Sequence, residues 1–255
     1  NETNKNLIFL FMFKNIIFSE NIFSNAEQLV LVISKEWYSQ SAYLYCLEKV
    51  NDKWELSGLN WPVVVGKKGM AWGKKFEFFE QNENMKKEDD LKSPAGIFPI
   101  RKMLYGYSEK PQKNVKLPYF QLTKEIIGVD DPKSIYYNKI IKKCEISIID
   151  WNSYEEMKRD DELYKWLLVI EHNVNPILPG NGSCIFIHIW KNRKTGSAGC
   201  TSMSEENILK LIEWLLPEKN PHILQIPFDV FSKIKNFLKL PDVPHKINKN
   251  MLLDK

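Results

Sequence analysis

The sequence predicts a β-rich mixed α/β domain, and three patterns lead to that prediction. Residues 28–37, 41–50 and 53–57 are rich in Val, Leu, Ile and Tyr, and a turn-forming Asn-Asp pair separates the second segment from the third. Residues 185–190 form a further apolar run that is typical of a strand. After residue 202, apolar side chains recur at helical spacing, which predicts a helix beside the strands.

The segments between these patterns predict turns and shorter elements. Three glycines within 66–73 predict a turn, and Asp131 before Pro132 predicts another. Successive side chains of an extended segment point to opposite sides, so Asp130 and Asp131 are not expected to form a paired-carboxylate site. The other expectations are a surface loop over 76–92, a short helix over 153–159 capped by Ser153, a strand over 167–170, a loop over 171–183, a strand over 222–226, a helix over 229–240 and a loose tail over 242–255.

Composition narrows the classes of partner and cofactor. The chain has 255 residues and a net charge of +4, from 36 Lys and Arg against 32 Asp and Glu. Its lysine pairs are scattered and no basic block is interleaved with aromatic residues, so no nucleic-acid partner is expected. The four cysteines form no CxxC pair and the four histidines lie at no zinc-ligand spacing, so neither a metal nor a cofactor is expected.

The most specific local pattern joins His188, within the apolar run, to Cys200, on a turn of small residues. Ser202 with Glu205 has the pattern of a capping box, which predicts a helix that begins directly after Cys200. The positive end of a helix dipole favours the thiolate, the nucleophilic form of cysteine, so a low-pKa thiol is expected. Gly199 allows a tight turn there. The backbone N–H groups of Cys200 and of Gly199 or Ala198 would then stabilise an oxyanion, and the pattern indicates acyl transfer.

The positions of the histidines and of the residues around Cys200 predict their roles in the reaction. His188 is the expected general base, and a backbone carbonyl near Ile189 is expected to orient its ring. His172 lies in a predicted loop and is the alternative base, better suited to substrate contact. The further candidates on the substrate side are Trp190, Ser197 and Thr201. A purely structural interpretation stays open, in which His188 is a hydrogen-bonded core residue and Cys200 a small buried hydrophobic residue.

Segments that precede the pair extend the pattern over most of the chain. Residues 63–73, 87–100 and 129–132, with Ser134, Tyr137 and Asn138 behind them, stand in this order before the His/Cys block. In that order they resemble the L,D-transpeptidase catalytic domain family, also called YkuD-like, over about residues 28–227. The resemblance implies a curved β-sandwich with flanking helices, and a cysteine acyl-enzyme that acts on peptidoglycan stem peptides.

The chain departs from the family pattern at three positions. Ala198 stands where members often have a second histidine, Ser202 where many have an arginine, and Ile189 where the residue is usually small. The resemblance implies cleavage of the donor stem peptide after its third residue, followed by transfer to an amine, which forms a crosslink. Two alternatives stay open. One is transfer to water, by an L,D-carboxypeptidase or another cysteine hydrolase of wall peptides, and the other is a non-catalytic wall-binding module.

The first 26 residues have the order of a secretory signal peptide. Lys5 precedes an apolar run at 7–13, and Ser24 and Ala26 form a small-x-small site, so cleavage after Ala26 is expected. The alternative is an amphipathic or buried N-terminal segment. The run is too short to span a membrane, and no integral membrane span is predicted elsewhere. The expected organisation is a signal peptide over 1–26, a catalytic domain over 27–228, and a C-terminal helix and tail over 229–255. The expected address is the periplasm or cell envelope.

Overall fold

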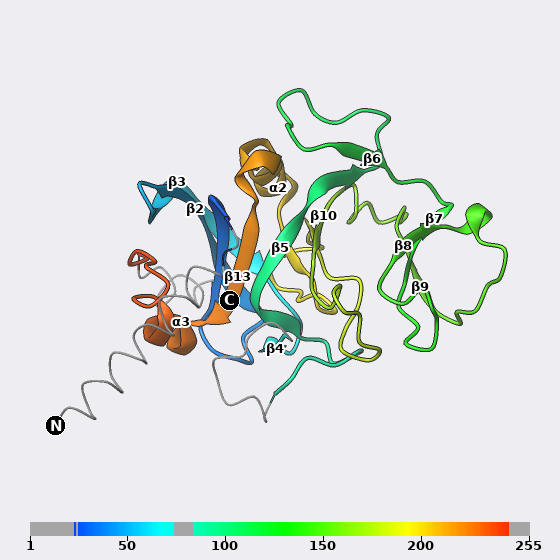
Figure 1. Cartoon of the computed structure of the whole chain (residues 1–255), viewed down its shortest axis with the longest axis horizontal. Helices are drawn as coiled ribbons and strands as arrows, with labels where there is room; N and C mark the ends of the chain where they lie inside the picture. Colours follow the sequence, from blue (N-terminus) through cyan, green and yellow to red (C-terminus); the bar gives the residue numbers. More distant parts are fainter. Residues whose placement is uncertain (1–22, 24, 74–83, 245–255) are drawn as a thin grey trace.

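A strongly curved mixed sheet forms the centre of the molecule (Figure 1). The computed structural model describes residues 23, 25–73 and 84–244. The neighbouring strands of the main sheet follow the order β10-β11-β12-β3-β2-β1-β13-β5-β4, with β6 beside β5. Their bounds are β1 Gln28–Ser34, β2 Ser41–Val50, β3 Lys53–Val64, β4 Met70–Trp72, β5 Ser93–Gly106, β6 Tyr119–Gln121, β10 Trp166–Ile170, β11 Phe186–Ile189, β12 Thr201–Met203 and β13 His222–Pro227.

The long strand β5 closes the main sheet, because it pairs with both β13 and β10. Its first part pairs antiparallel with β13, where Phe98 lies opposite Ile223, and its last part pairs with β10, where Tyr105 lies opposite Leu167. Because β10 is also the neighbour of β11, the strands form a closed path. The apolar faces of β1, β2, β13 and the first half of β5 enclose the main core, which includes Leu31, Leu44, Phe98 and Leu224. Closure leaves few free strand edges and positions β11 beside β12.

A second, three-stranded sheet lies beside β10, to the right in Figure 1. It contains β7 (Ile126–Val129), β8 (Ile140–Lys142) and β9 (Tyr154–Glu156), in the order β8-β7-β9. The predicted helix over 153–159 is therefore wrong. Glu155 pairs antiparallel with Gly128 of β7, and this ladder outweighs the local capping pattern at Ser153.

Among the residues that the structure describes, two α-helices flank the main sheet, α2 (Glu205–Trp214) and α3 (Phe228–Ile234). The predicted capping box at Ser202 is wrong, because Ser202 lies within β12 and Ser204 is the N-cap, accepting a hydrogen bond from the Asn207 backbone N–H. The helix predicted over 229–240 is shorter than expected. Short 3₁₀ turns occur at Lys143–Glu145 and Pro217–Lys219.

The prediction of a β-rich mixed α/β fold is confirmed. The strands expected near 28–37, 41–50, 167–170 and 222–226 are present as β1, β2, β10 and β13, and β1 ends earlier than expected, at Ser34. β3 is much longer than the expected 53–57, since it continues to Val64 along β2. From local composition the strand is expected to end near the small residues Ser57 and Gly58. In the structure, pairing with β2 extends the strand beyond them.

Most of the predicted signal peptide and of the predicted C-terminal tail lies outside the described residues. The apolar run at 7–13 is in this part of the chain, and part of the loop expected at 76–92 is also outside the described residues. Phe23 is buried against Trp54, with ring centroids 5.2 Å apart, and Ala26 is 1% exposed. Cleavage after Ala26 stays a prediction, and it would remove the Phe23 contact. Over the described ranges, no helix is both long and apolar enough to cross a membrane.

Candidate active site

Cys200 lies at the end of a turn that leads into β12, beside β11. Its Sγ accepts a hydrogen bond from the Phe186 backbone N–H at 3.3 Å and donates to the Cys184 carbonyl at 3.6 Å. β11 and β12 run parallel, with Ile187 opposite Thr201, so the thiol lies one register position before the paired segment. The Cys200 side chain is buried and belongs to an apolar cluster that also contains Phe186 and Tyr164.

The turn before Cys200 is held by serine hydroxyls. Ser93 Oγ and Ser197 Oγ both donate to the Cys200 carbonyl, at 3.1 and 2.5 Å. The Gly199 N–H donates to Ser197 Oγ at 3.1 Å. A Cβ at Gly199 would lie 3.1 Å from the Lys92 carbonyl, which explains why the smallest residue occupies this position. These bonds fix the carbonyl side of the turn and present the thiol to a small cavity.

This cavity has a volume of about 80 Å³, and most of its lining residues are ionisable. Cys200, Gly199 and Ala198 form one side of it. Four acidic residues line it as well, and they come from three separate segments: Glu88 with Asp89, Asp130, and Glu155. The other lining residues are Lys86, Leu91, Ser183, Cys184 and Ile185.

Most of the charged groups around the cavity have a defined partner. Lys86 is 5% exposed and forms an ion pair with Asp90 at 2.6 Å. Glu88 accepts hydrogen bonds from Tyr137 and, at 2.8 Å, from Ser183. Among the described residues, Asp130 Oδ1 is buried and has no hydrogen-bond partner. The expectation that Asp130 and Asp131 point apart agrees with this geometry, since Asp131 instead accepts from the Lys133 N–H.

Glu155 is connected to His188 through the ring of Tyr164. The Tyr164 hydroxyl donates to Glu155 Oε2 at 2.6 Å, and the Tyr164 ring contacts the His188 ring edge-to-face, with centroids 4.9 Å apart. The guanidinium of Arg159 lies over the same tyrosine ring, 5.0 Å from its centroid. Four side chains from β9, the loop after it and β11 therefore form one packed group beside the cavity.

His188 is buried on β11, and its Nδ1 lies 2.7 Å from the Ile189 carbonyl. The prediction that a carbonyl at Ile189 orients this ring agrees with the contact. Nδ1 carries the proton in that arrangement, which leaves the lone pair on Nε2. The ring packs on Tyr164 and makes no hydrogen bond to Cys200 within the described part of the chain.

Burial sets the protonation states of the pair. It raises the pKa of the Cys200 thiol, and the nearby Glu155 carboxylate raises it further. Burial also lowers the pKa of His188 to about 4, against the opposing effect of the Ile189 carbonyl. The expected low-pKa thiol disagrees with this burial, and β12 lies between Cys200 and α2, the helix whose N-terminus was expected to favour the thiolate. At neutral pH the pair is a thiol and a neutral imidazole.

The other sequence candidates lie apart from the cavity. His172 is buried in a loop, where its Nε2 lies 2.8 Å from the Asn181 carbonyl and its ring contacts Phe98 edge-to-face. Thr201 is fully buried and donates to Gln225 at 2.7 Å. Trp190 follows β11 and hydrogen-bonds through its backbone to Met203, and Ser197 acts on the turn itself.

The sequence does not mark Glu155 or Tyr164 as residues of the site. It predicts a helix around Glu155, and Tyr164 follows a charged stretch, Arg159 to Glu162, without clear periodicity. No local pattern marks either residue, because their proximity to Cys200 arises from the pairing of β9 with β7.

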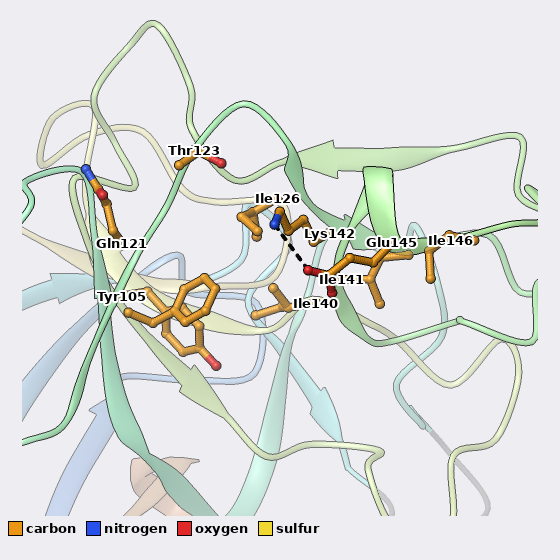
Figure 2. Close-up of a pocket in the computed structure, with 10 residues that line it drawn as sticks. Tyr105, Gln121, Thr123, Ile126, Ile140, Ile141, Lys142, Glu145 and Ile146 are labelled. Atoms are coloured by element: carbon orange, nitrogen blue, oxygen red, sulfur yellow. Dashed lines mark hydrogen bonds and ion pairs between the residues drawn. The ribbon is translucent and has the colours of Figure 1, made fainter.

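A second and larger pocket lies away from Cys200, between β6 and the small sheet (Figure 2). Its volume is about 600 Å³, and Ile126, Ile140 and the aromatic ring of Tyr105 form its apolar walls. Lys142 and Glu145 form an ion pair at its edge, with 3.1 Å between Nζ and Oε1. Its lining contains neither Cys nor His, so size alone does not identify the reactive site.

Metal ligation finds no support at either pocket. No group of three or more His, Cys, Asp or Glu side chains is arranged to hold a metal ion in the part of the chain that the structure describes. All four cysteines are free thiols, and Cys144 is the exposed one.

Comparison with known proteins assigns the chain to a family. Residues 39–224 match the YkuD family, described as the L,D-transpeptidase catalytic domain. The chain belongs to the L,D-transpeptidase catalytic domain family. This match covers the cavity and both members of the His/Cys block, so the resemblance predicted from the motifs is confirmed.

Further comparisons add little to the family assignment. No curated protein matches the chain. Among solved structures, the chain is similar to the helical cell shape determining protein Pgp2 from Campylobacter jejuni, with 13% sequence identity and a TM-score of 0.38. That alignment covers 80% of this chain and 49% of Pgp2, so the chain spans about half the length of that protein.

Proposed function

We propose that this L,D-transpeptidase family member is an envelope enzyme that acts on peptidoglycan stem peptides through a thioester at Cys200. The observation that carries the proposal is the thiol itself, which a serine-held turn presents to a cavity lined by ionisable side chains. Family membership supports the same chemistry. The finer assignment is cleavage of a stem peptide after its third residue, with transfer of the acyl group to an amine.

The chemistry begins with removal of the thiol proton. Nε2 of the neutral His188 accepts that proton, while the Ile189 carbonyl holds Nδ1–H and so fixes the tautomer. Because the resting thiol bonds Cys184 rather than His188, substrate binding must bring sulfur and imidazole together. The sulfur then attacks the peptide carbonyl. The backbone N–H groups of Cys200 and Ala198 are the donors for the oxyanion, since Gly199 N–H already serves Ser197.

A second candidate is a non-catalytic wall-binding module. The burial of Cys200 and its raised pKa favour this candidate, because an activated nucleophile normally has a depressed pKa. The absence of the family's usual arginine at Ser202 favours it too. In that case the cavity binds a wall peptide and Cys200 never forms a thioester.

Mass spectrometry of the products separates these functions. The protein is incubated with purified disaccharide-tetrapeptides, with and without an added acceptor amine, beside Cys200→Ala and the control Cys144→Ala at an exposed thiol. Crosslinked product that depends on Cys200 supports the transpeptidase. Tripeptide with released amino acid, whether or not the amine is present, identifies an L,D-carboxypeptidase. Binding of the muropeptide without a thioester adduct or product would identify the binding module.

A further inference from the structure

Glu155 is the carboxylate of the Cys200 cavity that is best connected to the His/Cys pair. It occupies the middle of β9, where the exposure pattern alternates and Glu155 is the residue turned inward between two exposed neighbours. Its pairing with Gly128 brings β9 close to the segment that carries Cys184, because Cys184 Sγ lies 2.8 Å from the position that a Cβ at Gly128 would occupy. The pairing of β9 with β7 therefore brings this side chain to the cavity that Cys200 also lines.

The hydrogen bond from Tyr164 leaves one face of the Glu155 carboxyl group available. Tyr164 donates to Oε2 at 2.6 Å, and the tyrosine is itself held between His188, Phe186 and Arg159. The tyrosine hydroxyl donates this hydrogen bond, and a carboxyl oxygen can accept it in both protonation states. The bond therefore forms whether Glu155 is ionised or protonated. The other carboxyl oxygen can carry a proton toward the cavity.

Burial, together with the surrounding charges, brings the pKa of this carboxyl group into the neutral range. Removal from water raises the pKa of Glu155 to about 7, the Asp130 and Glu88 carboxylates add to the rise, and Arg159 and the Tyr164 hydrogen bond oppose it. The other ionisable groups around it are the ion-paired Lys86, Asp89, and the buried thiols of Cys184 and Cys200. A group with this balance can both release and accept a proton at neutral pH.

We propose that Glu155 is a second proton-transfer group of the Cys200 site, acting on the leaving amine and on the incoming nucleophile. This proposal rests on the thioester function proposed above. In acylation, His188 takes the thiol proton, sulfur bonds to the carbonyl carbon, the C–N bond breaks, and Glu155 gives its proton to the leaving amine. In deacylation, the carboxylate takes a proton from the amine or water that attacks the thioester, and protonated His188 returns its proton to the sulfur. Both groups finish as they began.

The test compares two donors with the same acyl group. One is the tetrapeptide stem, whose amine leaving group needs a proton, and the other is a nitrophenyl ester, whose phenolate leaves without one. For Glu155→Gln, we expect acylation by the peptide to slow by roughly 10² to 10⁴-fold, the usual contribution of a positioned acid, and acylation by the ester to change less than about threefold. The amide oxygen of glutamine still accepts the Tyr164 bond, so the fold is expected to persist.

Two matched variants separate proton transfer from a structural role. Glu156→Gln changes the exposed neighbour on β9 and is expected to leave both rates unchanged. Tyr164→Phe removes the hydrogen bond but keeps the ring on His188, and it is expected to slow peptide acylation less than Glu155→Gln does. The pH profile of kcat/KM for the peptide should also lose its limb near pH 7 in Glu155→Gln.

Three results would overturn the proposal. The first is that Glu155→Gln slows acylation by the peptide and by the ester equally, and the second is that it does not slow acylation by the peptide. The third is that Tyr164→Phe slows acylation by both donors as much as Glu155→Gln does. If the wild-type protein forms no Cys200 adduct with the ester either, the thioester function itself fails. That outcome removes the Glu155 role with it and differs from every pattern that concerns Glu155 alone.

Discussion

At the scale of single residues, the site is defined by groups that burial keeps uncharged. Cys200 and His188 are 6% and 7% exposed, and desolvation is the largest influence on the pKa of each. A charged thiolate and imidazolium would each cost more in this surrounding than in water, so the resting pair is neutral. Activation must therefore accompany the binding of a substrate that brings its own dipoles and displaces the Cys184 contact.

Replacing each histidine distinguishes the base from a structural residue. For His188→Ala, acylation of Cys200 is expected to slow by roughly two to four powers of ten, the usual contribution of a positioned base. His172→Ala is expected to leave the acylation rate nearly unchanged, because His172 bonds the Asn181 carbonyl outside the cavity. The rate of a mass-detected adduct measures both, with circular dichroism as the control for folding. Loss of acylation in His172→Ala with retention in His188→Ala would reverse the assignment of the base.

The protonation state of Cys200 has its own test. Alkylation of the free protein by iodoacetamide is expected to be slow at neutral pH and to rise only above the ordinary cysteine range of about 8.5. The physical reason is burial together with the negative charge of Glu155. Alkylation of Cys200 is followed by peptide mass spectrometry as a function of pH, and the exposed Cys144 provides an internal reference. An inflection for Cys200 below that of Cys144 would mean that the thiol is activated without substrate.

At the scale of elements, the site depends on short segments that are held by long-range contacts. The turn between β3 and β4 is an example. The Gly66 carbonyl accepts a hydrogen bond from the Gly69 N–H, and the Gly66 N–H donates to Ser93 Oγ at 3.0 Å. Ser93 in turn donates to the Cys200 carbonyl. The glycine turn is thus linked to the reactive turn through one serine.

Substitution at two glycines tests this dependence. Gly69 has φ +82°, and a Cβ there would lie 1.9 Å from the Trp37 carbonyl, whereas Gly58 has φ +90° and open space around it. Gly58→Ala is expected to cost about 1–2 kcal/mol of unfolding free energy from backbone strain alone. Gly69→Ala adds an overpacking cost of about 1–3 kcal/mol and should be clearly less stable. Urea unfolding of both variants measures the difference, and equal stabilities would show that the turn relaxes around the added methyl group.

At the scale of the whole molecule, buried titratable groups couple stability to pH in opposite directions. Burial holds the pKa of His172 and of His188 at about 4, below the ordinary 6.5, so the unfolded chain binds more protons than the folded one between these values. Their contribution to stability is lost as pH falls through that window. Glu155, with its pKa raised to about 7, contributes stability at low pH that is lost as pH rises from about 4.5 toward 7.

Burial also lowers the pKa of His222, so three histidines oppose the one carboxyl group and the unfolding free energy is expected to fall from pH 6.5 to pH 5. His172 and His188 each contribute a slope of about 1.4 kcal/mol per pH unit in this range. His172→Gln should flatten the fall, and Glu155→Gln should steepen it, because the opposing contribution is removed. Urea unfolding at the two pH values measures all three proteins. A slope that is unchanged in His172→Gln would mean that this imidazole titrates normally.

The sequence alone predicted the β-rich class, the strands of strong composition, the family and the His/Cys block, because these reside in local composition, spacing and motif order. It also predicted the turn at Asp131, since an Asp before Pro bends the chain whatever surrounds it. The tertiary structure decided the rest. β9 is a strand because β7 pairs with it, and Cys200 is a buried thiol because it packs against Phe186 and Tyr164. Glu155 and Tyr164 join the site for the same reason: strand pairing and desolvation depend on partners far away in the chain, and no local pattern encodes them.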